Sequence, residues 1–133
     1  MKKVIGTACL VVFLCLGCSV EKENDAKVKD LDFVIVEEKD VPEELKKVME
    51  SKKQQIFKLT YEDNGEMYIA VGYGEQKIGG YSIQIKELYL SENAVYFDTD
   101  LKGPKKEEIT EETKSYPYIV VKTEHRDESV VFQ

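Results

Sequence analysis

The stretch that decides the fold reads IFKLTYEDNGEMYIAVGY, from Ile56 to Tyr73. Its centre, Asn64-Gly65, is the strongest short signal for a β-hairpin, because both positions of such a tight turn need a positive φ. Apolar residues alternate with other residues on both sides of the turn, as they do in strands. In the second strand, Met67, Ile69, Val71 and Tyr73 share one face, and Tyr68, Ala70 and Gly72 share the other. We therefore predict an antiparallel hairpin over residues 56–73.

Four more strands are predicted after the hairpin. Glycines at positions 72, 74, 79 and 80 indicate a loop, and Tyr81–Leu90 then alternates again, with a change of phase that a β-bulge near Lys86-Glu87 would repair. The other predicted strands cover Val95–Leu101, Tyr118–Lys122 and Ser129–Phe132. The charged segment Lys105–Ser115 lies between the strands Val95–Leu101 and Tyr118–Lys122, and its sequence predicts at most one loose helical turn.

A strand and a helix are predicted before the hairpin. Leu31–Glu37 is a short, nearly continuous apolar run, as in a buried strand. Asp40 and Glu43 have the spacing of a capping box, which places the start of a helix at Asp40 and its end near Lys52 or Lys53. The apolar face of this helix would be formed by Val41, Leu45, Val48 and Met49.

Together these elements predict an α+β domain, with a strongly bent antiparallel sheet or small barrel of about seven strands and one helix packed on it. The chain has 133 residues, which is enough for one domain of ordinary size. We expect this single domain to occupy residues 31–133.

The N-terminus has the pattern of a signal peptide. Lys2 and Lys3 precede an apolar run of 13 residues, Val4–Leu16, which is shorter than a membrane-spanning helix requires. The run ends in Leu14-Cys15-Leu16-Gly17-Cys18, which resembles a bacterial lipobox. This resemblance implies cleavage after residue 17 and a diacylglyceryl group on Cys18, which would anchor the protein to the extracytoplasmic face of the cell membrane.

Residues 18–30 are then expected to be the lipidated cysteine and a polar, flexible tether. All three cysteines of the chain lie within residues 1–18, so cleavage would leave Cys18 alone and lipidated. The cleaved chain would have 116 residues, and the loss of two lysines would change its net charge from −7 to −9.

Composition and motifs argue against several kinds of chemistry. A net charge of −7 does not suit nucleic-acid binding. His125 is the only histidine, and we expect it in an exposed turn. Asp98-Thr-Asp100 lacks the remaining residues of a calcium loop, and the acidic cluster of Glu107, Glu108, Glu111 and Glu112 is typical of a solvated surface. We predict no catalytic, cofactor-binding or metal-binding residues.

Two motifs resemble a known family. Gly74-Glu-Gln-Lys-Ile-Gly79-Gly80-Tyr81-Ser-Ile83-Gln-Ile85 and Tyr116-Pro117-Tyr118-Ile-Val-Val-Lys122 are similar to the C-terminal domain of the PrcB family, with the resemblance extending over about residues 68–123. The family consists of bacterial envelope proteins, often lipoproteins, and is named after a subunit associated with a secreted subtilisin-like protease. Membership would imply a protein partner of that kind.

The residues of these motifs have both a structural and a functional interpretation. Glycine pairs and a proline at the start of a strand commonly serve the fold alone. The functional interpretation is a rim that binds a partner protein, formed by Gly79, Gly80, Tyr81, Tyr116, Pro117 and Tyr118, together with Tyr73.

Three functions therefore stay open at this point. We favour a lipid-anchored, non-catalytic envelope protein that binds or stabilises another extracytoplasmic protein, such as a secreted protease. The alternatives are a small-molecule or ion-sensing envelope module and an enzyme that uses only carboxylates.

Overall fold

The computed structural model describes residues 26–108 and 113–133. The predicted signal peptide, Cys18 and the first part of the predicted tether lie outside these residues. Among the described residues, no helix has the length and hydrophobicity that a membrane crossing needs.

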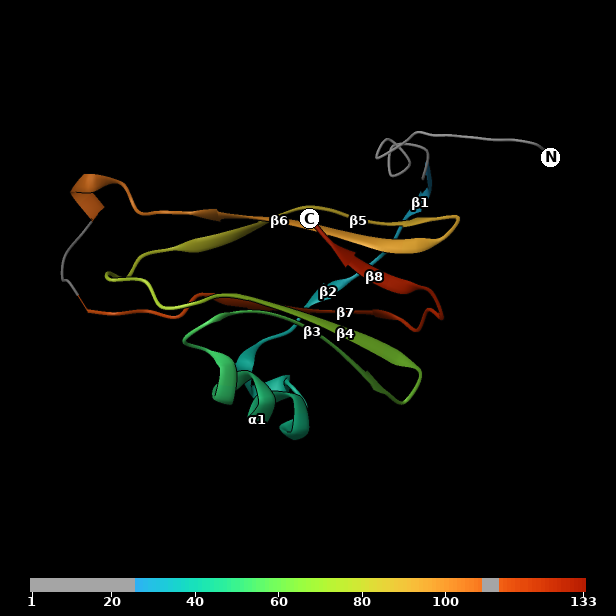
Figure 1. Cartoon of the computed structure of the whole chain (residues 1–133), viewed down its shortest axis with the longest axis horizontal. Coiled ribbons are helices and arrows are strands. Elements are labelled where there is room, and N and C mark those ends of the chain that lie inside the picture. The colour runs from blue at the N-terminus through green and yellow to red at the C-terminus, as the bar shows by residue number, and fades with distance from the viewer. Residues whose placement is uncertain (1–25, 109–112) are drawn as a thin grey trace, which may run out of the picture.

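Two four-stranded sheets stack face to face, and one helix covers the outer face of one of them (Figure 1). The first sheet has the order β1-β5-β6-β8, with β1 Lys27–Asp30, β5 Ser82–Ser91, β6 Ala94–Lys102 and β8 Ser129–Phe132. The second has the order β2-β7-β4-β3, with β2 Val34–Ile35, β7 Tyr118–Glu124, β4 Glu66–Tyr73 and β3 Ile56–Asp63. The helix, α1, spans Glu43–Lys52, and short 3-10 helices cover Glu38–Asp40 and Lys106–Glu108.

The α+β class is confirmed. The small barrel, which was the second of the two predicted sheet arrangements, is not observed in the described residues, because both sheets are open. The described residues contain eight strands rather than about seven. The additional strand is β1, and the strand order contains one parallel pair, β6 with β8.

The predicted hairpin is confirmed residue by residue. β3 pairs with β4 from Ile56↔Tyr73 to Asp63↔Glu66 without a register shift. Asn64 and Gly65 form the turn with φ values of 52° and 79°. The bulge predicted near Lys86-Glu87 is also present, since the β5–β6 register shifts between Ile85 and Glu87.

Strand β4 is buried on both of its faces. One face packs between the sheets, in a core formed by Leu31, Met67, Ile69, Val71, Leu88, Leu90, Val95, Phe97 and Val121. The other face packs under α1, in a core formed by Val41, Leu45, Met49, Phe57, Tyr68, Ala70 and Val120. The two faces contain the two sets of β4 residues that the alternation predicts.

The segment before α1 differs most from the prediction. Leu31–Glu37 is not a buried strand: Leu31 is buried, but only Val34 and Ile35 form β2, and both are exposed. The helix begins at Glu43 and not at Asp40, which lies in the preceding 3-10 turn. No side chain caps the helix, since its N-cap is Pro42, so the predicted capping box is wrong. Val48 is exposed, and the other three residues of the predicted apolar face are buried.

The last four residues of the predicted tether, residues 18–30, are not flexible chain. Lys27–Asp30 form β1, which pairs with β5. Lys27 Nζ lies 2.9 Å from carboxylate oxygens of both Glu87 and Asp30, and these hydrogen bonds raise the Lys27 pKa to about 12. The Leu31 N–H donates to Leu88 O at 3.0 Å. The sequence pattern missed this strand because its four residues are all exposed, so no buried face marks it.

Candidate functional site

A row of three paired residues crosses the helix-covered sheet near one end. Gly72 of β4 is opposite Phe57 of β3 on one side and Tyr118 of β7 on the other. A Cβ atom on Gly72 would lie 2.6 Å from Phe57 Cδ2 and Cζ, because the phenyl ring occupies the space above the glycine. Phe57 is buried. The glycine therefore lets an aromatic ring lie flat on the sheet, where it forms the floor of a groove.

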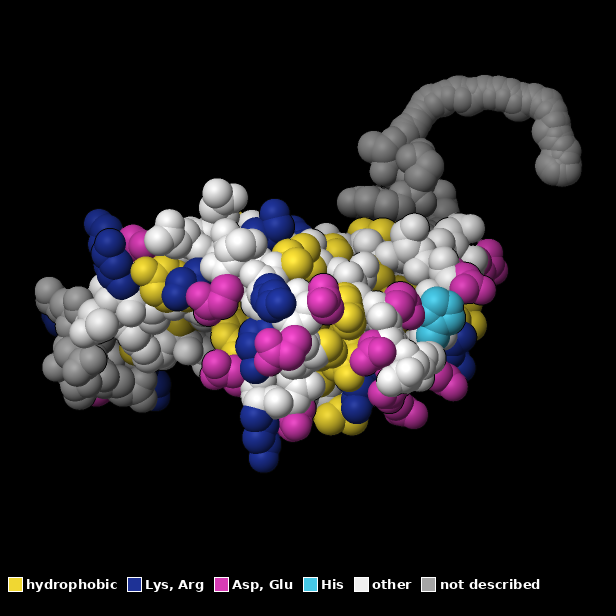
Figure 2. Space-filling model, turned by 90° about the horizontal axis from the view of Figure 1, so that it is seen from below, with side chains coloured by type: hydrophobic (Ala, Val, Ile, Leu, Met, Phe, Trp, Pro, Cys, Tyr) yellow, Lys and Arg dark blue, Asp and Glu magenta, His cyan; other side chains and the backbone are white. Residues whose placement is uncertain are grey.

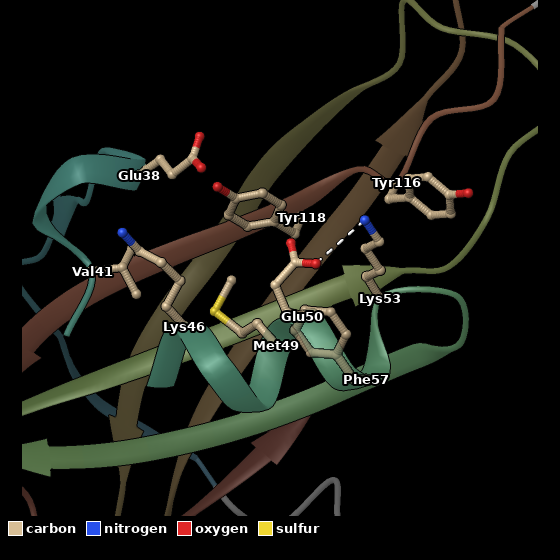
Figure 3. Close-up of a pocket in the computed structure, with 9 residues that line it drawn as sticks. All are labelled: Glu38, Val41, Lys46, Met49, Glu50, Lys53, Phe57, Tyr116 and Tyr118. Carbon is tan, nitrogen blue, oxygen red and sulfur yellow. Dashed lines mark ion pairs between the residues drawn. The ribbon is translucent and has the colours of Figure 1, made fainter. Parts of the chain in front are cut away.

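We call this feature the α1–β7 groove; it has a volume of about 220 Å³ and lies between α1 and the start of β7 (Figure 3). Its lining combines an apolar floor, two tyrosines and a charged rim, from Glu38, Val41, Lys46, Met49, Glu50, Lys53, Phe57, Tyr116 and Tyr118. Tyr118 is 39% exposed, and it is among the large hydrophobic side chains that face solvent.

Charged groups hold the tyrosine rim on one side of the groove. Lys53 Nζ lies 3.4 Å from Glu50 Oε1 and 4.9 Å from the centre of the Tyr116 ring. The Tyr116 hydroxyl donates to Glu75 Oε1 at 3.3 Å. Each of these contacts is exposed and contributes little to stability, but together they link the end of α1 to the segment before β7.

The Tyr118 hydroxyl is neutral over the physiological range. Partial burial raises its pKa above the ordinary value, and the nearby carboxylates of Glu38 and Glu50 raise it further. In Figure 3 the ring of Tyr118 lies between these two side chains. The groove thus presents a protonated phenol, which can donate and accept hydrogen bonds, beside apolar surface.

The six residues predicted to form one binding rim lie in two places. Tyr116 and Tyr118 line the α1–β7 groove, and Pro117 lies between them, with its carbonyl accepting from the Tyr73 N–H at 3.0 Å. Gly79, Gly80 and Tyr81 do not line the groove.

The glycine pair lies in the β4–β5 loop, which is tied to the segment before β7. Gln76 and Ser115 exchange two backbone hydrogen bonds, and Ser115 Oγ donates to Ile78 O at 2.6 Å. Gly80 has a φ of +87°, and a Cβ atom there would lie 2.9 Å from Pro104 Cβ. Gly80 thus has a structural role in the chain turn next to Pro104.

Tyr73, also suggested for the rim, faces the other way. Its hydroxyl is 2.6 Å from Thr99 Oγ1 on β6, so it connects the two sheets.

Most of the groove lining was not among the predicted site residues. Val41 and Met49 were assigned only to the apolar face of the helix, and Phe57 only to a strand. The available signal was Gly72 within a strand, because such a glycine often marks a close approach of another group. The charged residues Glu38, Lys46, Glu50 and Lys53 carry no local signal that separates them from other surface charges.

Other titratable groups lie away from the groove. His125 is in the β7–β8 turn, with Nδ1 2.5 Å from Glu62 Oε1 and Nε2 2.8 Å from Asp127 Oδ1, and the histidine marks one end of the face shown in Figure 2. Within residues 26–108 and 113–133, no group of three or more His, Cys, Asp or Glu side chains is placed to hold a metal ion. Glu111 and Glu112 lie outside the described residues.

In a comparison with protein families, residues 67–124 match the family model described as PrcB C-terminal. This match confirms the resemblance found in the two motifs. It runs from β4 to the end of β7, and α1 and β3 precede it. One wall of the groove, with Tyr116 and Tyr118, therefore belongs to the matched region, and the other wall, from α1 and β3, lies before that region in the sequence. No curated protein and no solved structure matches the chain.

Proposed function

We propose that this chain, which carries a PrcB C-terminal domain at residues 67–124, is a lipid-anchored, non-catalytic protein of the cell envelope that binds another extracytoplasmic protein. A secreted protease is the partner that the family resemblance suggests. The α1–β7 groove is the observation that carries the proposal.

The groove has the composition of a site for a protein side chain. Exposed tyrosine beside apolar surface, with charged residues at the edge, is typical of the centres of protein interfaces. Its volume of about 220 Å³ suits one large side chain from a partner. Pockets for whole small-molecule ligands usually have volumes of about 300–1,000 Å³, so this groove suits a side chain of a partner better than a whole small molecule.

The proposed anchor restricts how far the domain can stand from the membrane. Because β1 begins at Lys27, residues 19–26 are the link between Cys18 and the folded domain. Eight extended residues span at most about 28 Å. A partner would therefore be bound close to the membrane surface.

The test replaces Tyr118 with a photo-crosslinking amino acid in the full chain, which is expressed in the cells that naturally carry it. Phe33, in the segment before β2, is the matched control position, because its exposed fraction is 37% against 39% for Tyr118 and it does not line the groove. We expect a specific crosslinked protein from position 118 and none from position 33. The captured protein, once purified, should bind the Tyr118→Ala variant at least about tenfold more weakly, as expected for an aromatic interface anchor. Equal crosslinking from both positions, or unchanged binding by Tyr118→Ala, would contradict the proposal.

A further inference from the structure

The outer edge of β6 is only half covered. Strand β8 pairs with β6 from Ala94↔Ser129 to Phe97↔Phe132. In the described part of the chain, no strand lies against the same edge from Asp98 to Lys102. Figure 1 shows β8 ending beside the middle of β6, while β6 continues.

The main-chain groups of this open edge point toward the position that an added strand would take. The Phe97 carbonyl faces β8, since it accepts from the Gln133 N–H at 2.9 Å. Successive residues of a strand direct their main-chain N–H and C=O groups to opposite edges of the strand. The groups of Thr99 and Leu101 therefore point to the same edge as those of Phe97. Such a row of unpaired groups is a template for strand addition.

A slot of about 160 Å³ lies beside this edge, between the two sheets. Its walls include Ile56, Tyr73, Phe97, Thr99 and Phe132. Ile56 is paired with Tyr73 and so shares the face that points between the sheets, yet it is 68% exposed. In the described residues, the sandwich therefore has an apolar gap beside the unpaired part of β6.

We propose that an extended segment of a partner protein adds to the open edge of β6 at residues 98–102 and places an apolar side chain in the slot. The segment would continue the line of β8 and complete the edge of the sheet. This inference goes beyond the proposed groove function, because the slot and the α1–β7 groove lie on opposite faces of the β2-β7-β4-β3 sheet.

Charge indicates which side chains the added segment carries on its other face. The outward side of β6 next to the open edge carries Asp98 and Asp100, and Glu87 is the β5 partner of Asp98. Lys102 pairs with Asp100 at 3.2 Å, and Lys27 pairs with Glu87, but no lysine or arginine of the described residues forms an ion pair with Asp98. The outward residues of the segment are therefore Lys or Arg, which alternate with Val, Ile or Leu. Lys58 borders the slot, where its stem can lie on apolar surface while its ammonium group stays in water.

A peptide with this pattern provides the probe. The full chain contains no tryptophan, so the fluorescence of the peptide Lys-Ile-Lys-Ile-Lys-Gly-Trp, with blocked ends, reports its binding without interference. We expect saturable binding. In the register of β8, the residue after the inward-facing Phe132 donates its N–H to the Phe97 carbonyl, so the lysine amides of the peptide face β6. A version methylated on the amides of its second and third lysines, which cannot donate these ladder hydrogen bonds, should bind at least about tenfold more weakly. The version with Glu in place of Lys should also bind more weakly.

Two matched protein variants locate the site. Ile56→Lys puts a charge at the slot, and Ile35→Lys makes the same change on β2, the opposite edge strand of the sheet, at an exposed fraction of 57%. We expect Ile56→Lys to weaken peptide binding at least about tenfold and Ile35→Lys to leave it unchanged. Both positions are exposed, so both variants should fold. Tyr118→Ala should also leave peptide binding unchanged, which separates this site from the groove.

Three results would overturn the proposal. The first is the absence of saturable binding, and the second is equal binding of the methylated peptide. The third is self-association of the full chain that Ile56→Lys abolishes, because the slot would then hold a second copy.

Discussion

The phenyl ring of Phe57 occupies the space that a side chain at Gly72 would need. The two residues are directly paired on β3 and β4, and a Cβ atom on Gly72 would lie 2.6 Å from two of the ring atoms. The ring is thereby held on the sheet beneath α1, where it packs with Val41, Leu45 and Met49. One glycine thus supports both the helix-side core and the floor of the α1–β7 groove.

Replacing Gly72 by alanine should displace this ring. We expect Gly72→Ala to lower the free energy of unfolding by about 1–3 kcal/mol, the usual cost of overpacking a core. Urea denaturation of the variant would measure this change. Gly79→Ala is the control, because a Cβ atom there meets no other atom within 4 Å. Equal losses in both variants would show that the ring does not depend on the glycine.

The hydrogen bond between Tyr73 and Thr99 should stabilise the packing of the two sheets. The hydroxyls are 2.6 Å apart. Tyr73→Phe should lower the free energy of unfolding by about 1 kcal/mol. A double-mutant cycle with Thr99→Val isolates the pair, because the second change should cost less once the first has been made. Strictly additive losses would contradict a direct interaction.

Stability should depend on pH through His125. Hydrogen bonds to Glu62, and then to Asp127, raise the His125 pKa above 6.5 in the folded protein. A group with a raised folded pKa stabilises the fold fully below its unfolded pKa of about 6.5, and this contribution is lost as the pH rises through the folded value.

The measurement is the unfolding midpoint as a function of pH, compared between the unchanged protein and His125→Gln. The difference between the two proteins should be largest at acid pH, below about 6.5, and should shrink at alkaline pH. NMR titration of the imidazole gives the folded pKa directly. A folded pKa at or below the ordinary value would contradict this prediction.

The proposed anchor depends on one thiol. Cys18→Ala should prevent attachment of the diacylglyceryl group and release the protein from the membrane fraction. Fractionation of cells that express each form provides the measurement, and Cys15→Ala is the control because it retains the cysteine at position 18. Continued tight membrane association of Cys18→Ala would refute the lipoprotein hypothesis.

Local patterns in the sequence predicted the elements whose signals lie within a few residues. The Asn64-Gly65 turn requires positive φ values, and the structure has them. The change of phase after Ile85 requires a bulge, and the register shifts there. The alternation along β4 separates two sets of residues, and each set enters a different core.

Longer-range features could not be predicted in this way. The exposed residues of β1 carry no periodic signal, and their place is fixed by contacts to β5 some sixty positions away, such as Lys27 with Glu87. The capping pattern at Asp40 failed because Pro42 is the N-cap, so the helix begins at Glu43, three residues after Asp40. The α1–β7 groove combines residues from the helix, β3 and the segment before β7, and no local pattern links them.

The sequence by itself determined the turn, the bulge, the two faces of β4 and the PrcB-like motifs, because each depends on the conformational preferences or the polarity of neighbouring residues. Only the tertiary structure decided that the strands form two open sheets, that Phe57, Gly72 and Tyr118 lie in one row, and that β8 leaves half of β6 uncovered. These features depend on which distant strands pair and in what register. The pairing and the register depend on the burial of whole sheet faces during folding, so no single segment of the sequence predicts them.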